Sequence, residues 1–301
     1  MTDAAAAGSR PISVTTVGST ARRVLLLTHR APEATSGALP TVLAILREHG
    51  VEVVVPPTEV IKHERLAEFT SSEGVQLAGD GTDLILVLGG DGSMLRALAR
   101  EAGSGAPVVG VNYGRVGFLC AIERDDLESG LRRVIAGDYQ VIGLPSLAVD
   151  WSDGWVSAVN DLALLRGGES RIADLSFAID GEKVANVRCD GVVVSTPVGS
   201  TAYNLAAGGP TVSWRARCFV LSFLAGHHLD TRPFVIGPEE HLTVTNSAIW
   251  GTCDVLADGV KVGSLAPGRQ VTVGLGGAEV RLGMFGENSF FRRYREKFGR
   301  G

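Results

Sequence analysis

The stretch DLILVLGGDGSMLRALARE, residues 83–101, combines three patterns that follow one another directly. LILVL (84–88) is continuously apolar, which is typical of a parallel strand that is buried on both faces. GGDGS (89–93) is a glycine-rich turn, and the residues after it have a helical pattern, with Ser93 as the predicted N-cap. A turn of this kind between a strand and a helix points backbone N–H groups at an anion. The stretch therefore predicts an α/β unit with a site for an anion.

The same alternation of strands and helices surrounds this stretch. RVLLLT (23–28), VEVVV (51–55) and PVVGVN (107–112) are further apolar runs. ALPTVLAILREHG (38–50) carries its apolar residues on one helical face and ends in a glycine. Continuous apolar strands that are joined by helices predict a parallel sheet covered on both faces.

A different pattern begins at about residue 131, where the apolar segments become short and partly alternating. Asp180-Gly181 and Asp258-Gly259 have the composition of two-residue hairpin turns. This pattern predicts an antiparallel, sandwich-like β-rich domain. We therefore expect three parts: a mobile tail at 1–20, an α/β domain at 21–130 and a β-rich domain at 131–283.

The C-terminal segment NSFFRRYREKFG (288–299) returns to a helical pattern. We expect Phe290, Phe291, Tyr294 and Phe298 on one side of this helix, with the charged residues opposite, as is normal for an amphipathic helix. The helix is predicted to pack on the α/β domain, which adds residues 284–301 to that domain.

Composition excludes several classes of protein. The chain has 301 residues and a net charge of −5, which argues against a general nucleic-acid binder. The longest apolar stretch, near CFVLSFLAG (218–226), is far shorter than the roughly 20 residues of a membrane span, so no membrane partner is expected. The four cysteines are scattered without a CxxC pair, and the N-terminus has no apolar core of a secretory signal. These features favour reduced thiols and a cytoplasmic location.

Asp91 in the middle of GGDGS raises a chemical question, because a carboxylate repels a phosphate. The turn lacks the third glycine of a dinucleotide fingerprint and the lysine of a phosphate-binding P-loop. Either a metal ion bridges Asp91 and the phosphate, or the carboxylate has another target. A purely structural turn explains the glycines as well. No cluster of side chains with metal-ligand spacing accompanies the turn.

Two further stretches carry polar groups that a core would not need. CDGVVVSTPVGSTAYNLAAGGP (189–210) is rich in glycine, hydroxyl and amide groups, which suits a hydrogen-bonding ligand such as a nucleoside. Tyr203 could cover the face of a base. Asn160 and Asp161 interrupt an apolar run, and such a pair suits ribose hydroxyls or an adenine edge. In the stretch 189–210, the hydroxyl and amide groups belong to Ser195, Thr196, Ser200, Thr201, Tyr203 and Asn204.

Together these stretches resemble the NAD kinases, from about residue 23 to residue 298. The long block that contains STPVGSTAY carries most of the specificity, since GGDG alone is also similar to phosphofructokinases and diacylglycerol-type lipid kinases. The motifs occur in the family's order: GGDGS at 89–93, VNYGRVGFL at 111–119, ND at 160–161, DGVVVSTPVGSTAYNLAAGGP at 190–210, HHLDTRP at 227–233 and ADG at 257–259.

The resemblance implies phosphorylation of NAD at the adenosine 2′-hydroxyl to give NADP. Asp91 then corresponds to the catalytic base that accepts the hydroxyl proton, a role worth about 10²–10⁴ in rate. Gly89, Gly90, Gly92 and Ser93 form the phosphate loop, and Mg²⁺ or another divalent cation is expected with the phosphoryl donor. The donor is ATP or inorganic polyphosphate, and a homodimer or homotetramer is expected. The resemblance places NAD against Asp91, Gly92, Asn160, Asp161, Arg171, Arg188, Asp190, Val198, Thr201, Ala202, Tyr203 and Ala206.

Four positions depart from the family's pattern. Asp161 stands where Glu is usual, Val198 where Thr or Ser is usual, and Ala206 where Ser is usual. Val260 replaces the Gln that commonly follows the late Asp-Gly. Each lost neutral hydrogen bond is worth roughly 0.5–1.5 kcal/mol, so NAD binding or the preference between NAD and NADH is open to change.

Two other functions compete with an NAD kinase. One is a kinase for another hydroxyl substrate, a sugar phosphate or a lipid, against which the STPVGSTAY block argues. The other is a dinucleotide-binding regulator with little catalysis, which the departures favour and the intact GGDGS disfavours.

Overall fold

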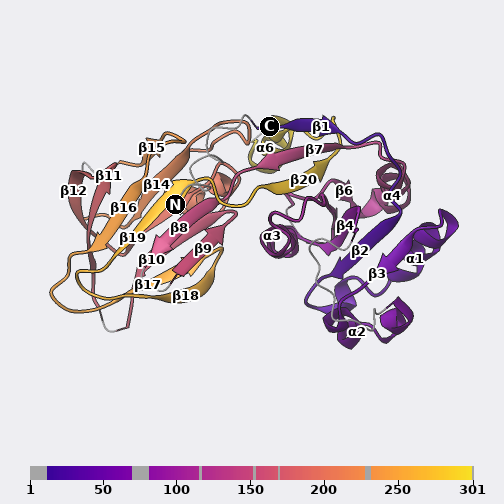
Figure 1. Ribbon diagram of the computed structural model, residues 1–301, viewed down its shortest axis with the longest axis horizontal. Helices are drawn as coiled ribbons and strands as arrows, with labels where there is room; N and C mark the ends of the chain where they lie inside the picture. The colour runs from indigo at the N-terminus through magenta and orange to yellow at the C-terminus, as the bar shows by residue number, and fades with distance from the viewer. Residues whose placement is uncertain are drawn as a thin grey trace. The chain divides into compact units, whose positions relative to one another are not determined.

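The computed structural model describes residues 12–69, 81–114, 117–151, 154–168, 170–227 and 232–299. Parts of two sequence motifs, residues 115–116 and 228–231, lie outside these ranges, as do residues 1–11 of the expected tail. The chain forms two compact units (Figure 1). The first comprises Ser13–Gly143 with residues 280–299, and the second comprises Leu144–Glu279.

The first unit is built on an eight-stranded sheet with the order β1-β7-β20-β5-β4-β2-β3, and β6 pairs with β5. Neighbouring strands from β3 to β20 are parallel wherever their register is resolved, and every residue of β4 and β5 is buried. α3 packs on β4, β5 and β20, whereas α1 and α4 pack against each other. The predicted α/β fold is therefore confirmed. Its strands are β1 (Val14–Thr16), β2 (Arg23–Thr28), β3 (Glu52–Val54), β4 (Leu84–Gly89), β5 (Val108–Asn112), β6 (Ile122–Glu123), β7 (Gln140–Leu144) and β20 (Val280–Met284). Its α-helices are α1 (Leu39–Glu48), α2 (Pro57–Lys62), α3 (Asp91–Arg100), α4 (Leu127–Ile135) and α6 (Phe290–Phe298).

Both ends of this unit differ from the sequence expectation. β1 forms inside the expected tail at 1–20 and pairs antiparallel with β7, so the sheet is mixed. Its side chains are all exposed, and no hydrophobic pattern therefore marked it. α4 runs across the expected boundary at 130/131, and the compact units instead divide at 143/144 and 279/280. The reason is that β7 and β20 add to the sheet of the first unit.

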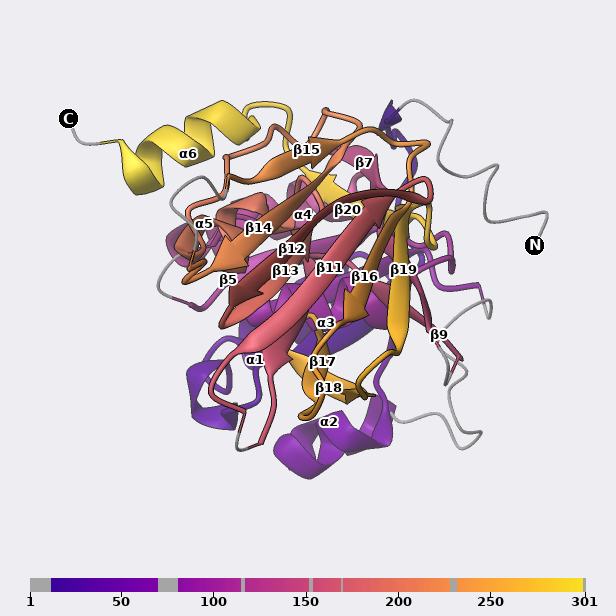
Figure 2. The ribbon, with the colours of Figure 1, turned by 90° about the vertical axis from the view of Figure 1, so that its left-hand side faces the viewer.

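The second unit contains two six-stranded antiparallel sheets, as the sandwich-like prediction requires. One has the order β15-β14-β13-β10-β17-β18, and the other has the order β12-β11-β16-β19-β8-β9, of which Figure 2 shows β11, β16 and β19 side by side. Residues of both sheets share one hydrophobic core. The strands are β8 (Leu147–Trp151), β9 (Gly154–Ala158), β10 (Asp161–Arg166), β11 (Ala173–Ile179), β12 (Glu182–Cys189), β13 (Gly191–Ser195), β14 (Phe219–Leu224), β15 (Phe234–Ile236), β16 (Leu242–Asn246), β17 (Cys253–Ala257), β18 (Val260–Leu265) and β19 (Gln270–Leu275).

The two predicted hairpin turns are confirmed. Asp180 and Gly181 join β11 to β12 with φ of 47° and 81°, and Asp258 and Gly259 join β17 to β18 with φ of 48° and 76°. Positive φ at both central residues is the signature of the type I′ turn, which matches the twist of the flanking strands.

The C-terminal helix α6 belongs to the first unit, as expected, but its faces differ from the prediction. Phe290 and Phe298 pack on Phe118, with ring centroids 6.2 and 5.8 Å away. Phe291, which was expected on the same side, is 70% exposed, whereas Arg293 is only 4% exposed. Helical spacing explains this, because Arg293 is three residues after Phe290 and shares its face. In the described ranges, no helix has the length and apolar character that crossing a membrane requires.

Candidate functional site

The glycine-rich turn lies where β4 ends and α3 begins. Gly90 is the N-cap of α3, and Asp91 is the first helical residue. Ser93 is therefore not the N-cap that the sequence predicted: its N–H donates to the Gly90 carbonyl at 2.9 Å, and its Oγ accepts from Arg96 Nη2 at 3.1 Å. The turn requires glycine at its first position, since a Cβ at Gly89 would lie 2.5 Å from the Cβ of Ser93.

The carboxylate of Asp91 is held by two backbone donors. Oδ2 accepts from the N–H of Phe118 at 2.7 Å, and Oδ1 accepts from the N–H of Leu119 at 2.9 Å. The side chain is only half-buried. Each oxygen retains a lone pair after these bonds, so the carboxylate can still accept a proton from a hydroxyl. The two N–H groups hold the carboxylate in place, and the remaining lone pairs are compatible with either explanation that the sequence left open, a bridging cation or another target.

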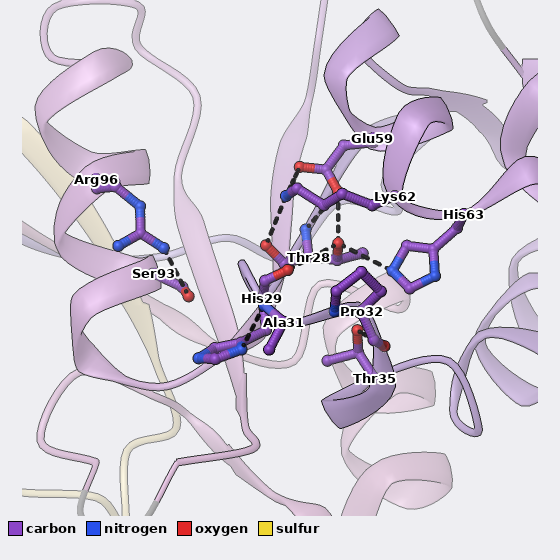
Figure 3. Close-up of polar contacts among 10 residues, drawn as sticks. All are labelled: Thr28, His29, Ala31, Pro32, Thr35, Glu59, Lys62, His63, Ser93 and Arg96. Carbon is purple, nitrogen blue, oxygen red and sulfur yellow. Dashed lines mark hydrogen bonds and ion pairs between the residues drawn. The ribbon is translucent and has the colours of Figure 1, made fainter.

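A buried polar cluster lies at the carboxyl end of β2, around Thr28 (Figure 3). Glu59 is 3% exposed, and its Oε2 accepts from the hydroxyl and the N–H of Thr28 at 2.5 and 3.1 Å. Lys62 Nζ donates to Glu59 Oε1 at 2.7 Å, and His63 Nε2 lies 3.2 Å from the Thr28 hydroxyl. Burial lowers the pKa of His63, and this effect exceeds the opposing influence of Glu59. Neither Glu59 nor His63 belongs to a sequence motif, so sequence patterns could not single them out.

Two arginines, Arg30 and Arg96, lie near this end of the sheet. Burial lowers the pKa of the Arg96 guanidinium, and the positive charge of Arg30 lowers it further, against the influence of Glu59. In the part of the chain that the structure describes, neither arginine forms an ion pair with a carboxylate. Figure 3 shows Arg96 beside Ser93 at the start of α3. Neighbouring cations that form no ion pair among the described residues, next to a helix N-terminus, are suited to a polyanion.

In the second unit, Asn160 and Asp161 lie at the start of β10. Asp161 is 6% exposed, and burial together with the nearby charge of Asp258 raises its pKa to about 7. Asp258 accepts from the backbone N–H groups of Val159, Asn160 and Asp161, at 2.9, 2.7 and 3.2 Å. Burial raises the pKa of Asp258, while these three bonds oppose the rise. The sequence marked Asp258 only as a turn residue, but it also orients the segment that carries the polar pair.

The side-chain oxygen of Asn160 has a distinct environment. Oδ1 is buried and has no hydrogen-bond partner among the described residues. An unpaired buried acceptor costs free energy, on the order of 1–3 kcal/mol. A ligand N–H or O–H group at this position would satisfy it.

The polar block after β13 packs directly on this pair. Thr196 Oγ1 donates to the Val159 carbonyl at 2.7 Å, and a Cβ at Gly199 would lie 2.1 Å from the Asn160 carbonyl oxygen. Ser195, Thr196, Ser200 and Asn204 are all fully buried and bonded within the protein. The expectation that their polar groups face a ligand is therefore wrong: they hold the loop in shape.

The remaining predicted residues of this block divide by exposure. Thr201 is half-buried, whereas Ala202, Tyr203 and Ala206 are exposed, and Val198 is only 4% exposed. Burial raises the pKa of the Tyr203 phenol, and the charges of Asp161 and Asp190 add to this effect. The phenol of Tyr203 therefore lies within the electrostatic influence of both carboxylates.

The two predicted arginines lie on the surface. Arg171 is exposed two residues before β11. Arg188 Nε donates to Asp174 Oδ2 at 3.2 Å, and both residues line a surface cavity of about 410 Å³ with Asn186 and His227. Asp190 is paired with Arg166, which no motif had indicated, at 3.0 Å. Among the residues that the structure describes, no three His, Cys, Asp or Glu side chains are grouped as metal ligands.

Comparisons with known proteins agree on one family. The family model of the ATP-NAD kinase N-terminal domain matches residues 24–139, and that of the ATP-NAD kinase C-terminal domain matches residues 159–282. The chain is 35% identical to the NAD kinase of Corynebacterium diphtheriae, over 86% of this chain and 85% of that protein. It is 34% identical to NAD kinase 2 of Streptomyces coelicolor, over 92% and 94% of the two chains.

Solved structures give the same result for the fold. An NAD kinase from Archaeoglobus fulgidus in complex with ATP matches with a TM-score of 0.70 and 27% identity, over 92% of this chain and 97% of that chain. A yeast NADH kinase complexed with NADH matches with a TM-score of 0.81 at 23% identity, over 94% and 89% of the two chains, which shows a shared fold. Since the two family models together match well over half of the sequence, the chain belongs to the NAD kinase family.

Proposed function

We propose that this protein transfers a phosphoryl group to the adenosine 2′-hydroxyl of NAD, giving NADP, with Asp91 as the general base. The transferase activity on NAD follows from membership of the family. The geometry of Asp91 supports the assignment of the base: it is a half-buried carboxylate at the start of α3, held by two backbone N–H groups.

The reaction needs a base because a hydroxyl is a weak nucleophile. Asp91 accepts the proton of the 2′-hydroxyl. At the same time the oxygen of that hydroxyl forms a bond to the terminal phosphorus of the donor. The bond from that phosphorus to the bridging oxygen breaks, and the shortened donor leaves with the electron pair. A positioned carboxylate base contributes about 10²–10⁴ in rate.

Binding of NAD in the second unit is proposed to use the Asn160–Asp161 pair and the face of Tyr203. The orphaned Oδ1 of Asn160 requires a donor, which the amino group of an adenine supplies. Asp161, with its pKa of about 7, can donate or accept a hydrogen bond near neutral pH, which suits a ribose hydroxyl. The remaining proposed contacts are Gly92, Arg171, Arg188, Asp190, Val198, Thr201, Ala202 and Ala206.

The phosphoryl donor is proposed to lie against the turn of Gly89, Gly90 and Gly92, with Ser93 beside it. Arg30 and Arg96 support this placement, since they are cations without carboxylate partners in the described ranges. ATP is the default donor. Inorganic polyphosphate presents the same phosphate chain and is the alternative.

A divalent cation fits this donor site. Mg²⁺ is usually held by one or two carboxylates together with substrate phosphates rather than by a cage of protein ligands. Asp91 supplies such a carboxylate at the turn, where the described residues hold no larger cluster of ligands. When bound, the cation would neutralise charge on the transferring phosphoryl group.

A direct assay tests the proposed function. The protein is incubated with NAD and Mg²⁺ and either ATP or polyphosphate, and NADP is detected with an NADP-specific dehydrogenase. NADP formation with either donor is expected, and the two arms identify the donor. Phosphorylation of a sugar phosphate or lipid instead, or NAD binding without turnover, would support the competing functions.

A cytoplasmic location and a homodimer or homotetramer stay predictions. The free thiols of all four cysteines are consistent with a cytoplasmic location.

A further inference from the structure

Arg293 is an unusual residue for the helix in which it lies. Its neighbours Arg292 and Arg295 are exposed on α6, but Arg293 is only 4% exposed. A buried guanidinium normally requires a carboxylate, because removing its charge from water is costly. Within the described ranges, Arg293 has no ion pair with an Asp or Glu, and burial lowers its pKa. The guanidinium of Arg293 must therefore be stabilised by groups other than a paired carboxylate.

The partners of Arg293 are two backbone carbonyls of a single loop. Nη1 donates to the carbonyl of Gly117 at 3.1 Å, and Nη2 donates to the carbonyl of Cys120. These two carbonyls bracket Phe118 and Leu119. The N–H groups of the same two residues hold the oxygens of Asp91 at 2.7 and 2.9 Å. One guanidinium thus fixes both ends of the segment that binds both carboxylate oxygens.

Other contacts of the helix and the turn secure the same segment. The ring of Phe118 packs between Phe290 and Phe298, and Lys297 Nζ lies 5.3 Å from its centroid. The thiol of Cys120 donates to the carbonyl of Gly89 at 3.4 Å, which connects the segment to the glycine-rich turn. The segment is therefore held between α6 and the turn that carries Asp91.

We propose that Arg293 is a positioning residue for Asp91, which it orients through the backbone of residues 117–120. This inference rests on the proposed role of Asp91 as the base. A general base must lie within hydrogen-bonding distance of the proton that it removes. Without Arg293 the segment that carries the two N–H groups loses its fixed position and orientation, and the carboxylate is free to rotate away from the substrate hydroxyl.

The test compares Arg293→Met and Arg293→Lys with the control Arg292→Gln. Arg292 is the adjacent arginine, half-exposed, and its side chain is paired with Glu296 on the surface. We expect Arg293→Met to lower kcat about 10- to 100-fold, because a small misplacement of a catalytic group has effects of this size. The KM for NAD should change little, and Arg293→Lys should recover part of kcat, since an ammonium can reach one of the two carbonyls. Arg292→Gln should match the wild type.

A double-mutant cycle with Asp91→Asn separates positioning from general stabilisation. In the Asp91→Asn background, Arg293→Met should change the residual kcat by less than about twofold, because no base remains to be placed. Equal losses in both backgrounds, or a folded Arg293→Met enzyme with wild-type kcat, would overturn the proposal. If Arg293→Met does not fold, the double-mutant cycle with Asp91→Asn is measured with Arg293→Lys instead. A wild-type kcat for Arg293→Lys would then also overturn the proposal. Full activity of Asp91→Asn alone would refute the base and this inference together, whereas additive losses refute only the role of Arg293.

Discussion

The carboxylate of Asp258 accepts a hydrogen bond from the backbone N–H of Asn160 at 2.7 Å, across 98 residues of sequence. A hairpin turn between β17 and β18 thereby fixes the first residues of β10. The turn also adds negative charge next to Asp161, and this charge contributes to the raised pKa of that residue. The hairpin is therefore part of the proposed dinucleotide site.

Replacing Asp258 should affect the protein much more than replacing its counterpart in the other hairpin. Asp180 has the same turn geometry, but its carboxylate is exposed and accepts one backbone bond, from His241. Asp258→Ala and Asp180→Ala share the strain of alanine at positive φ, so the difference between them reports the three part-buried hydrogen bonds of Asp258. We expect Asp258→Ala to lower the free energy of unfolding by about 2–4 kcal/mol more than Asp180→Ala, as measured by urea denaturation. Equal effects of the two substitutions would contradict this.

Asp91→Asn should remove most turnover while NAD binding survives. An amide has nearly the volume of the carboxylate, but it cannot accept the hydroxyl proton, so kcat should fall by about 10²–10⁴. Steady-state kinetics gives kcat, and calorimetry gives the affinity for NAD. Retention of more than about a tenth of wild-type kcat would be incompatible with base catalysis by this residue.

Asp161 should make the protein less stable as the pH rises. Its pKa is about 7 in the folded protein and close to 3.8 in an unfolded chain, so the folded state binds the proton more tightly. The free energy of unfolding should therefore fall between about pH 4 and pH 7, by a few kcal/mol at most. Asp161→Asn removes this dependence and should gain stability relative to the wild type at pH 8 but not at pH 4. Thermal denaturation across this range provides the measurement, and Asp150→Asn, at an exposed site on β8, is the control.

The two hydroxyl groups that are usual in the family should behave differently when they are restored. Ala206 is exposed and belongs to the proposed NAD site, so the added hydroxyl of Ala206→Ser should lower the KM for NAD by about 2- to 10-fold with kcat unchanged. Val198 is 4% exposed, so Val198→Thr buries a hydroxyl and should lower the free energy of unfolding by about 1–3 kcal/mol. Kinetics and denaturation of the single variants distinguish these outcomes. Tighter NAD binding by a fully stable Val198→Thr protein would show that the buried site opens onto the ligand.

Removal of divalent cations should abolish turnover. The turn contains a carboxylate and no lysine, so the charge of a polyphosphate donor is not neutralised by the loop itself. Excess EDTA should stop NADP formation, and Mg²⁺ in excess of EDTA should restore it. Full activity in EDTA would mean that cations such as Arg30 and Arg96 are sufficient.

Local patterns in the sequence were enough to predict the strand, turn and helix at 83–101 and both Asp-Gly hairpins. Such features depend on residues that are close together in the chain. The sequence did not predict that Ser195, Thr196, Ser200 and Asn204 would be bonded internally, because a polar glycine-rich loop has the same composition whether its groups face a ligand or one another.

Arg293 shows a different limit of sequence reasoning. Its spacing from Phe290 places it on the buried face, yet its charge led to the expectation of an exposed position. The groups that accept hydrogen bonds from its guanidinium are the carbonyls of residues 117 and 120, which no pattern around residue 293 can indicate. Burial of a charge is predictable only when the distant partners are known.

The position of β20 between β7 and β5 has a consequence for synthesis on the ribosome. β5 ends at Asn112, but its neighbour β20 begins at Val280, so the second unit is translated in full before the first sheet can close. Until then β6 can pair only with the end of β5, at Val111 and Asn112, and the rest of this apolar strand edge stays open as a template for aggregation. Pairing over such a sequence distance also slows folding. Chains that terminate early, before β20 emerges, would carry this open edge permanently and are natural substrates for chaperones and proteases.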